Sequence, residues 1–391
     1  MTRKPDDFDP ELIVLGGGCA GLSLAARLLD ERPSMPIVVI EPRTEYCEDR
    51  TWCGWRLNDH FFQDCAIAEW NDWRILSKKG RSSLLRHSSY PYEMISASRF
   101  YDKACRVIER SSNATLLMGA EAGLVSEAAD HVLVHLADGT ILRSRYVIDT
   151  RPEPRVLKYP WLWQNFVGYV VALADSAFGL DDTPTLMDFQ DAGPDIARFM
   201  YVLPCGLNTF LCEFTNFSQR QDETALLEQE LVAWLNEHAG SGWRLLRRES
   251  GSLPMAPPPD ATQGRVFSAG TRGGSMRIST GYAFHRIQRW ADECASSILA
   301  TGAPLAPGRN PVLDGMDELF LSVLQQSSVS AGDLFGQLFR RCPTDPLVRF
   351  LSGVPRPRDL WSVARSLPWG RFLRAFPSLA SAYANKMRES R

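Results

Sequence analysis

Short apolar runs at the start of the chain predict a strand, a glycine turn, a helix and a second strand. Residues 11–15 form a β-branched run that ends in a glycine cluster, and residues 22–29 have the apolar pattern of a helix. A second apolar run, residues 37–40, ends at Glu41. This order predicts a βαβ unit with two parallel strands.

The glycines between the first strand and the helix have the spacing of a dinucleotide-binding turn. Gly16 permits the tight turn, Gly18 lets the backbone approach a pyrophosphate, and Gly21 lets the helix pack closely on the strand. Glu41 lies 20 residues after Gly21, where a carboxylate can accept hydrogen bonds from both ribose hydroxyls of an adenosine. The turn alone leaves FAD and NAD open.

The residues that follow favour FAD. No second glycine fingerprint follows, but a hairpin turn at residues 137–140 precedes a returning apolar strand at residues 145–150. This layout resembles the FAD-binding domain of the glutathione-reductase type, with Asp149 at the end of the strand as a candidate cofactor ligand. Arg99, in a predicted helix, either approaches the FAD phosphates or is solvated.

The middle of the chain changes to the two-residue alternation of strands and then returns to apolar and glycine-rich runs. The sequence predicts strands at 166–171, 185–189, 199–204 and 209–215, a helix at 224–238, a proline loop at 254–259, a strand at 265–270 and a helix at 282–299. These elements predict an α/β protein. Its Rossmann-like FAD-binding domain, residues 1–155 and 260–303, is interleaved with an antiparallel-sheet substrate domain, residues 156–259, and residues 304–391 add C-terminal helices.

Composition narrows the classes of function. The chain has 391 residues, 45% of them apolar and 23% charged, and a net charge of -3, which gives no reason to propose nucleic acid as a partner. Nine cysteines without a CxxC pair, and no histidines at ligand spacing, argue against a metal site and a disulfide framework. Residues 1–10 lack the order of a secretion signal, so a cytoplasmic location is expected. No apolar run is long enough to predict a transmembrane helix.

Several motifs, in order along almost the whole chain, resemble those of the bacterial lycopene cyclases. They are Asp49-Arg50-Thr51-Trp52-Cys53, Met187-Asp188-Phe189, residues 199–204, residues 210–215, residues 251–255, residues 273–284 and the C-terminal stretch 318–353. The resemblance implies an enzyme that cyclises the linear ends of lycopene, to β-ionone rings. It also implies that FAD is needed in its reduced state, with NAD(P)H as the electron source, although the reaction has no net redox change.

At two positions the sequence differs from the motifs of related proteins. Some lycopene cyclases carry a second carboxylate directly after the glutamate that corresponds to Glu213, and here that position is Phe214. Related flavin hydroxylases have Gly-Asp where this chain has Gly270-Thr271, which argues against a typical hydroxylase.

The resemblance also suggests which residues form the site. Glu213 lies in an apolar strand, where burial would keep a carboxyl protonated and usable as an acid, although an exposed strand glutamate is the alternative. Gly273, Gly274, Thr280 and Gly281 are expected to lie against the flavin, with a helix that opens at residues 280–282. The candidates for the substrate pocket are Trp52, Asp188, Phe199 and Tyr201, and Asp188 is equally well explained as a turn residue.

The C-terminal region is basic and aromatic. Residues 340–391 hold eleven Lys/Arg and three Asp/Glu, and arginines alternate there with Trp361, Trp369, Phe372 and Phe376. The mixture predicts helices attached peripherally to the inner face of the membrane. A FAD-dependent monooxygenase or halogenase acting on an apolar molecule, and a flavin-binding protein without catalysis, remain alternatives. The ring type, the number of ends that are cyclised, the carotenoid and the oligomeric state are left open.

Overall fold

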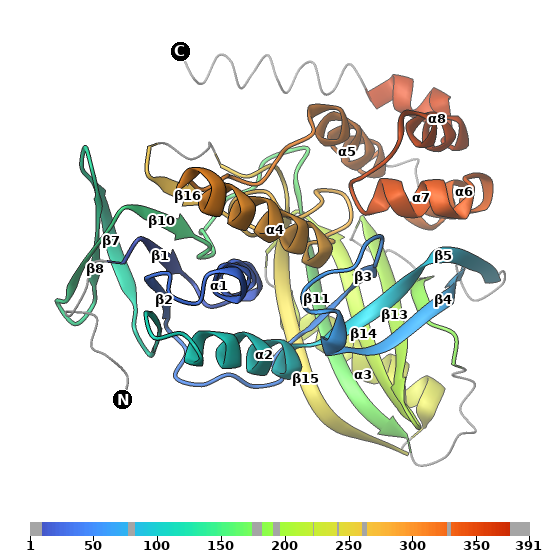
Figure 1. Cartoon of the computed structure of the whole chain (residues 1–391). Coiled ribbons are helices and arrows are strands. Elements are labelled where there is room, and N and C mark those ends of the chain that lie inside the picture. Colours follow the sequence, from blue (N-terminus) through green and yellow to red (C-terminus); the bar gives the residue numbers. More distant parts are fainter. Residues whose placement is uncertain are drawn as a thin grey trace.

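The computed structural model describes residues 10–76, 83–173, 182–190, 196–221, 223–240, 242–259, 264–326 and 330–375. A parallel sheet with its helices lies beside a larger curled sheet, and further helices gather at one end of the larger sheet (Figure 1). The chain passes from one sheet to the other several times. The α/β prediction, with a Rossmann-like part, a second sheet and C-terminal helices, is therefore confirmed.

The parallel sheet has the strand order β16-β10-β1-β2-β6. Its two central strands are buried along their whole length, as strands covered on both faces must be. Helix α1 packs against α2 and α4, and a small antiparallel sheet carries the predicted hairpin at residues 137–140. The elements of this part are β1 Leu12–Leu15, α1 Cys19–Glu31, β2 Ile37–Glu41, α2 Ala97–Glu109, β6 Ala114–Met118, β7 Ala122–Glu127, β8 Val132–Leu136, β9 Ile141–Ser144, β10 Tyr146–Asp149, β16 Val266–Ser268 and α4 Phe284–Thr301.

The larger sheet has the strand order β15-β11-β14-β13-β12-β4-β5-β3. Neighbouring strands are antiparallel except β12 and β4, which are parallel. Three strands come from residues 51–96, outside the segment in which the sequence predicted this sheet, because their alternating burial gives only short apolar runs. The strands are β3 Thr51–Trp55, β4 Ala66–Leu76, β5 Ser83–Ser96, β11 Leu162–Leu173, β12 Thr185–Phe189, β13 Ala197–Gly206, β14 Thr209–Ser218 and β15 Trp243–Met255.

The larger sheet curls until its two edge strands meet. Thr51 on β3 donates a hydrogen bond to Glu249 on β15 at 3.0 Å, although these strands are at opposite ends of the strand order. Helix α3, Thr224–Ala239, packs on the outer face. The inner face belongs to a second apolar core that also includes side chains of the C-terminal helices. Residues that project from the inner face are thereby enclosed.

The C-terminal helices cover the open end of the curl, on the upper right of Figure 1. Asn310 caps α5 by accepting from two backbone amides, and Ser330 caps α6. A buried ion pair between Arg349 and Asp359, at 2.7 Å, holds α7 against α8. The helices are α5 Pro311–Leu324, α6 Ala331–Arg341, α7 Thr344–Leu351 and α8 Pro357–Ser366. Among the described residues, no helix has the length and hydrophobicity that crossing a bilayer requires.

The segment before α4 differs from the expectation of a helix that opens at residues 280–282. Gly281 has φ +74°, and its amide donates to the carbonyl of Arg277, which closes a turn. Helix α4 therefore begins only at Phe284, and Thr280 lies in the turn that precedes it.

Candidate functional site

The glycine turn leaves an open space in front of α1. Gly16 has φ +98°, and a Cβ at Gly21 would lie 2.0 Å from the carbonyl oxygen of Gly16, so both positions require glycine. A Cβ at Gly18 would meet no atom within 4 Å. Gly18 is also the N-cap of α1, and no side chain of the described residues caps the amides there. An uncapped helix end with open space before it fits a phosphate group.

Glu41 lies directly beside this turn. Its carboxylate accepts from the backbone amide of Gly17 at 2.7 Å and from Arg43 Nε at 2.8 Å. Burial alone would raise the pKa of Glu41, but these hydrogen bonds hold it below the usual value, so the side chain is charged. Arg43 also donates to Asp49 and to the hydroxyl of Tyr101, both at 3.1 Å. The charged carboxylate is placed as a ribose-binding group should be.

Two other predicted cofactor ligands have partners within the protein. The carboxylate of Asp149, at the end of β10, accepts from Arg151 at 2.8 and 3.0 Å. Arg99 is exposed, and its guanidinium donates to the carbonyl of Ala66 at 3.3 Å. The structure thus brings Gly16, Gly18, Gly21 and Glu41 together, while Arg43 is the arginine beside Glu41.

The loop after β16 packs against the glycine turn. A Cβ at Gly270 would lie 3.0 Å from Ala20 Cβ, and Cβ atoms at Gly273 and Gly274 would lie 2.4 Å from the Ser268 carbonyl oxygen and 2.9 Å from Pro258. A Cβ at Gly281 would lie 2.6 Å from Oε1 of Gln164, a residue of β11. That amide oxygen is buried and has no hydrogen-bond partner among the residues that the structure describes. An unsatisfied acceptor where the two sheets meet fits a ligand that carries N–H or O–H groups.

Glu213 lies in a row of residues that crosses four strands of the larger sheet. Gly168 on β11 and Tyr201 on β13 are directly opposite Glu213, and Gly168 is also opposite Glu249 on β15. Residues opposite one another in a sheet project from the same face. This is the inner face, because the neighbouring residue Cys212 belongs to the core under α3.

Gly168 separates the two carboxylates without filling the space between them. A Cβ at this position would lie 3.1 Å from Cγ of Glu249 and 3.3 Å from Cδ1 of Leu211. Glu249 is buried, whereas Glu213 retains some accessible surface that faces the interior of the curl. The glycine thus allows two acidic side chains to lie near each other in an enclosed space.

Within the described part of the chain, only one of these two carboxyl groups has a cation as a partner. Burial raises the pKa of Glu213 to about 8; repulsion from Glu249 adds to this shift, and the Thr215 hydroxyl, which donates to Glu213 at 2.8 Å, opposes it. Burial also raises the pKa of Glu249, but Arg247 at 2.6 Å and Thr51 at 3.0 Å donate to its Oε2 and favour the charged form. Near neutral pH, Glu213 therefore keeps its proton, whereas the Glu249 carboxyl has two donors that favour its charged form.

Three tyrosines approach one another on the inner side. The hydroxyls of Tyr201 and Tyr92 share a hydrogen bond of 2.8 Å, and that of Tyr282 lies 3.4 Å from Tyr92. Burial raises the pKa of Tyr201 well above the usual value, so its hydroxyl stays neutral. Tyr201 is the residue opposite Glu213, which places aromatic side chains beside the acid.

The other predicted pocket residues are not gathered around Glu213. Phe199 shares the inner face of β13 with Tyr201 but packs on Phe189 and Phe217, with ring centroids 5.9 and 5.8 Å apart. Asp188 is opposite Met200, which belongs to the core under α3, so it projects from the outer face. Burial raises the pKa of Asp188 to about 6.

Trp52 likewise faces away from this row. Its ring lies 5.0 Å from that of Phe100 and 5.8 Å from that of Phe284, in the core around the parallel sheet. Cys53, the next residue of β3, packs instead against the inner core of the larger sheet. Of the four predicted pocket residues, only Tyr201 is directly opposite Glu213.

A separate buried glutamate is surrounded by cationic and imidazole groups. His60 and His285 donate to the same oxygen of Glu93 at 2.7 and 2.8 Å, and Arg56 donates to the other oxygen at 2.9 Å. Burial alone would raise the pKa of Glu93, but the two histidines lower it to about 2. The two histidines are 33 and 192 residues from Glu93, so sequence spacing did not reveal the cluster.

The family model described as "Lycopene cyclase protein" matches residues 11–376. The chain belongs to the lycopene cyclase family. A curated relative, the lycopene beta-cyclase of Pseudescherichia vulneris, is 27% identical over 312 residues, which are 75% of this chain and 76% of the relative. The expected family resemblance is therefore confirmed.

The fold of this lycopene cyclase family member is shared with solved structures, one of which contains FAD. A geranylgeranyl bacteriochlorophyll reductase-like protein from Thermoplasma acidophilum aligns with a TM-score of 0.65 and 13% identity, over 94% of this chain and 98% of that one. HpxO from Klebsiella pneumoniae, solved with FAD and uric acid, aligns with a TM-score of 0.61 and 14% identity, over 92% and 98%. At these identities the likeness concerns the fold.

Sequence reasoning missed Glu249, Arg43 and Tyr92. Arg43 could have been noticed, since it follows the end of the second strand by two residues. Nothing in the local sequence indicates that Glu249 and Glu213 share a row, because that depends on the register of two strand pairs through Gly168. In this family member the carboxylate that shares a row with Glu213 is on a different strand and not at the position after Glu213.

Proposed function

We propose that this chain is a FAD-dependent lycopene cyclase that closes the ψ-ends of lycopene to β-ionone rings by acid–base chemistry, without net redox change. The observation that carries the proposal is the position of Glu213 on the enclosed inner face of the curled sheet, where burial raises its pKa to about 8. Membership of the lycopene cyclase family supports the substrate class. A carboxyl group held neutral in an apolar interior is the acid that protonation of a hydrocarbon needs.

The glycine turn and its surroundings fit FAD. Gly16, Gly18 and Gly21 would hold the pyrophosphate before α1, and Glu41 would accept from the ribose. Gly273, Gly274, Thr280 and Gly281 belong to the segment whose Gly270 packs against Ala20 of α1, and the unpaired Gln164 oxygen offers an acceptor beside Gly281. FAD reduced by NAD(P)H would supply an electron-rich ring whose negative charge stabilises a nearby cation.

The chain's own residues account for the proton steps. The Glu213 carboxyl protonates the terminal double bond, and the next double bond attacks the resulting carbocation to form the ring bond. Loss of a proton from a ring carbon then gives the product, so protons and electrons balance and the mass is unchanged. The Glu213 carboxylate left after the first step is a base within the same enclosed space.

Aromatic faces and the exclusion of water would protect the cation. Tyr201, Tyr92 and Tyr282 are buried or half-buried, and their hydroxyls bond to one another rather than to solvent. Their rings can stabilise a positive charge by cation–π attraction. A carbocation shielded in this way closes its ring instead of being captured by water.

The same proposal includes peripheral attachment to the inner face of the cytoplasmic membrane. Trp361 and Trp369 are exposed on 66% and 54% of their surface, and Arg358 and Arg365 are exposed on the same helix as Trp361. Aromatic side chains at headgroup depth and arginines near anionic lipid would hold the enzyme there.

Sedimentation with anionic and neutral liposomes tests this attachment. Binding to the anionic vesicles that weakens with salt is expected, and absence of binding contradicts attachment.

Anaerobic turnover tests the function as a whole. Purified protein with FAD, excess reductant and lycopene in detergent should give a cyclic product of unchanged mass, identified by chromatography and mass spectrometry. An oxygenase or halogenase would need O₂ and would add mass to the product. If anaerobic protein left lycopene unchanged but aerobic protein added oxygen or halogen, the cyclase proposal would be wrong.

A further inference from the structure

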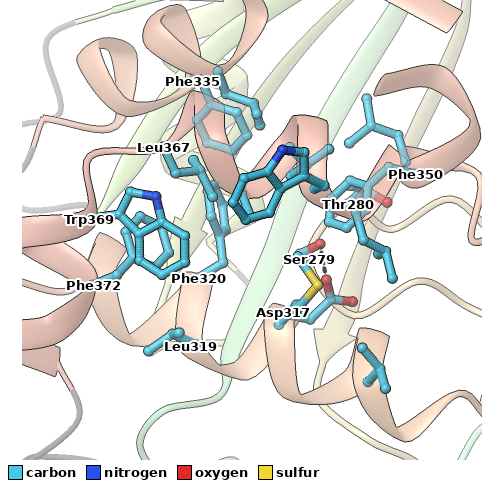
Figure 2. A pocket seen from close by; sticks show the side chains of 18 of the residues that line it. Ser279, Thr280, Asp317, Leu319, Phe320, Phe335, Phe350, Leu367, Trp369 and Phe372 are labelled. Atoms are coloured by element: carbon cyan, nitrogen blue, oxygen red, sulfur yellow. Dashed lines mark hydrogen bonds between the residues drawn. The ribbon is translucent and has the colours of Figure 1, made fainter. Parts of the chain in front are cut away.

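Helices α5 to α8 and the residues beside them line a cavity of about 460 Å³. Figure 2 shows the aromatic side chains of Phe320, Phe335, Phe350, Trp369 and Phe372 around it. Its volume lies within the roughly 300 to 1,000 Å³ of small-molecule sites. Its lining includes Ser279 and Thr280 but none of the residues in the row of Glu213, so the cavity is distinct from the proposed catalytic space.

The polar groups of the lining already have partners. All but three of the lining residues are apolar, the exceptions being Ser279, Thr280 and Asp317. The carboxylate of Asp317 accepts from Ser279 at 2.8 Å and from Arg277 at 2.8 Å, and Arg277 Nε lies 2.7 Å from its other oxygen. A ligand that required hydrogen bonds would find few free groups here, so the lining selects for hydrocarbon.

The aromatic lining of the cavity favours a flat unsaturated chain over a saturated one. Rings from α5, α6 and α7 and from the residues after α8 surround the cavity, and aromatic faces stack on a conjugated plane. Trp361 and Trp369, both exposed, belong to the lining, so the cavity reaches the surface where the aromatic side chains lie. Tyr201 and Tyr282 pack against the same apolar core that contains Phe320 of the lining.

We propose that this cavity is a holding site for the polyene chain of the carotenoid, between the membrane-facing helices and the Glu213 row. The site rests on the proposed function for the identity of its ligand. A carotenoid is long, and the cavity provides an apolar place for the part of the chain that is not at the acid. Occupation of the cavity would therefore strengthen substrate binding without entering the chemical step.

Binding and turnover should be measured separately. Ala364 lines the cavity on α8, so Ala364→Phe narrows it, whereas Ala225→Phe makes the same change at an exposed position of α3. Lycopene in detergent is titrated into each protein and followed by quenching of tryptophan fluorescence. We expect Ala364→Phe to raise Kd and KM about tenfold or more with kcat little changed, since overpacking opposes the ligand, and Ala225→Phe to match the parent.

A second variant keeps the proposal testable if Ala364→Phe does not fold. Trp361→Ser changes an exposed side chain, so folding should be retained, and the loss of one aromatic contact should weaken lycopene binding about threefold to tenfold. Parental binding by both Ala364→Phe and Trp361→Ser would overturn the proposal. So would displacement of lycopene by an equal concentration of a saturated acyl chain, which would make the cavity a lipid site. If the parent binds lycopene in this cavity but never cyclises it, the function proposal fails and the holding site stands.

Discussion

Glu93 on β5 and Glu213 on β14 belong to the same curled sheet and are both enclosed by protein, yet their pKa values move in opposite directions. Burial alone would raise both. Glu93 accepts from His60, His285 and Arg56, and its pKa falls to about 2, whereas Glu213 accepts from a single hydroxyl and faces Glu249, and its pKa rises to about 8. The number and charge of the donors therefore determine which glutamate keeps a proton.

The contrast also distinguishes a carboxylate that holds parts of the fold together from a carboxyl group that is available for a reaction. A carboxylate that is fully paired fixes neighbouring elements in place, and Glu93 joins β5 to the loop before β4 and to α4 through its two histidines. A carboxyl that lacks such partners is poised to release its proton to a substrate. Glu93 should therefore matter for the stability of the fold and Glu213 for turnover. Variants of each residue test this comparison.

The largest effect should come from removing the acid itself. Glu213→Gln keeps the shape of the side chain without a transferable proton, so cyclisation should fall by about 100-fold to 10,000-fold, the usual contribution of a general acid. Turnover is measured with reduced FAD under anaerobic conditions, and lycopene binding and thermal unfolding serve as controls that should not change. Parental turnover by this variant would remove Glu213 from the mechanism.

The matching substitution at Glu93 should affect stability instead. Glu93→Gln leaves Arg56 and two imidazoles without their buried carboxylate, so the free energy of unfolding should fall by about 3 kcal/mol, as measured by urea denaturation. Glu69 also pairs with Arg56 but is exposed, so Glu69→Gln is the control and should cost less than about 1 kcal/mol. Equal losses in the two variants would contradict the structural role of Glu93.

The sign of the pH dependence follows from the lowered pKa of Glu93. The stabilisation is present above the unfolded-state pKa, near 4.5, and is lost as pH falls toward about 2. The parent should therefore lose stability between these values more steeply than Glu93→Gln does. Urea denaturation at pH 6, 4.5 and 3.5 measures the difference, and parallel curves would mean that Glu93 has an ordinary pKa.

The sequence predicted local features well and long-range pairs poorly. Gly16, Gly18, Gly21 and Glu41 lie within one short βαβ segment, where the spacing of glycines and apolar runs determines the turn. Glu213 was predicted because it stands in an apolar strand within a family-like motif. Its partner Glu249 was not, because two carboxylates 36 positions apart meet only through the register of β14, β11 and β15.

Asp188 shows a second limit of the sequence. An irregularity in the pairing of β12 with β13 interrupts the two-residue alternation, so residue parity does not reveal which face Asp188 occupies. The edge contact between Thr51 and Glu249 has a similar cause, since curl accumulates over the whole sheet and no single strand encodes it. The parts that could not be predicted are those that depend on how strands are paired.

Removing the second carboxylate should shift the pH profile rather than abolish activity. Glu249→Gln takes away the charge that repels the Glu213 anion, so the pKa of Glu213 should fall from about 8. Because the proposed mechanism uses the protonated form, the rate should begin to drop at a lower pH, by about one unit, with about a tenfold loss at pH 9 and little change at pH 6. Arg247→Gln, which leaves Glu249 without its cation, is the companion variant. If the rate of Glu249→Gln fell at the same alkaline pH as the rate of the parent, the two acids would not interact.

The smallest effect should come from the single donor to Glu213. Thr215 is buried and its hydroxyl favours the anion of Glu213. Valine is nearly the same size but has no hydroxyl, so Thr215→Val should raise the pKa of Glu213 and move the alkaline limb of the pH profile to higher pH by a few tenths of a unit. Thr215→Ser retains the hydroxyl and should restore the parental limb, which a purely structural role of Thr215 would not explain. If the limb moved to lower pH in Thr215→Val, the hydroxyl would be stabilising the protonated acid, and the contrast with Glu93 would no longer rest on the count of donors.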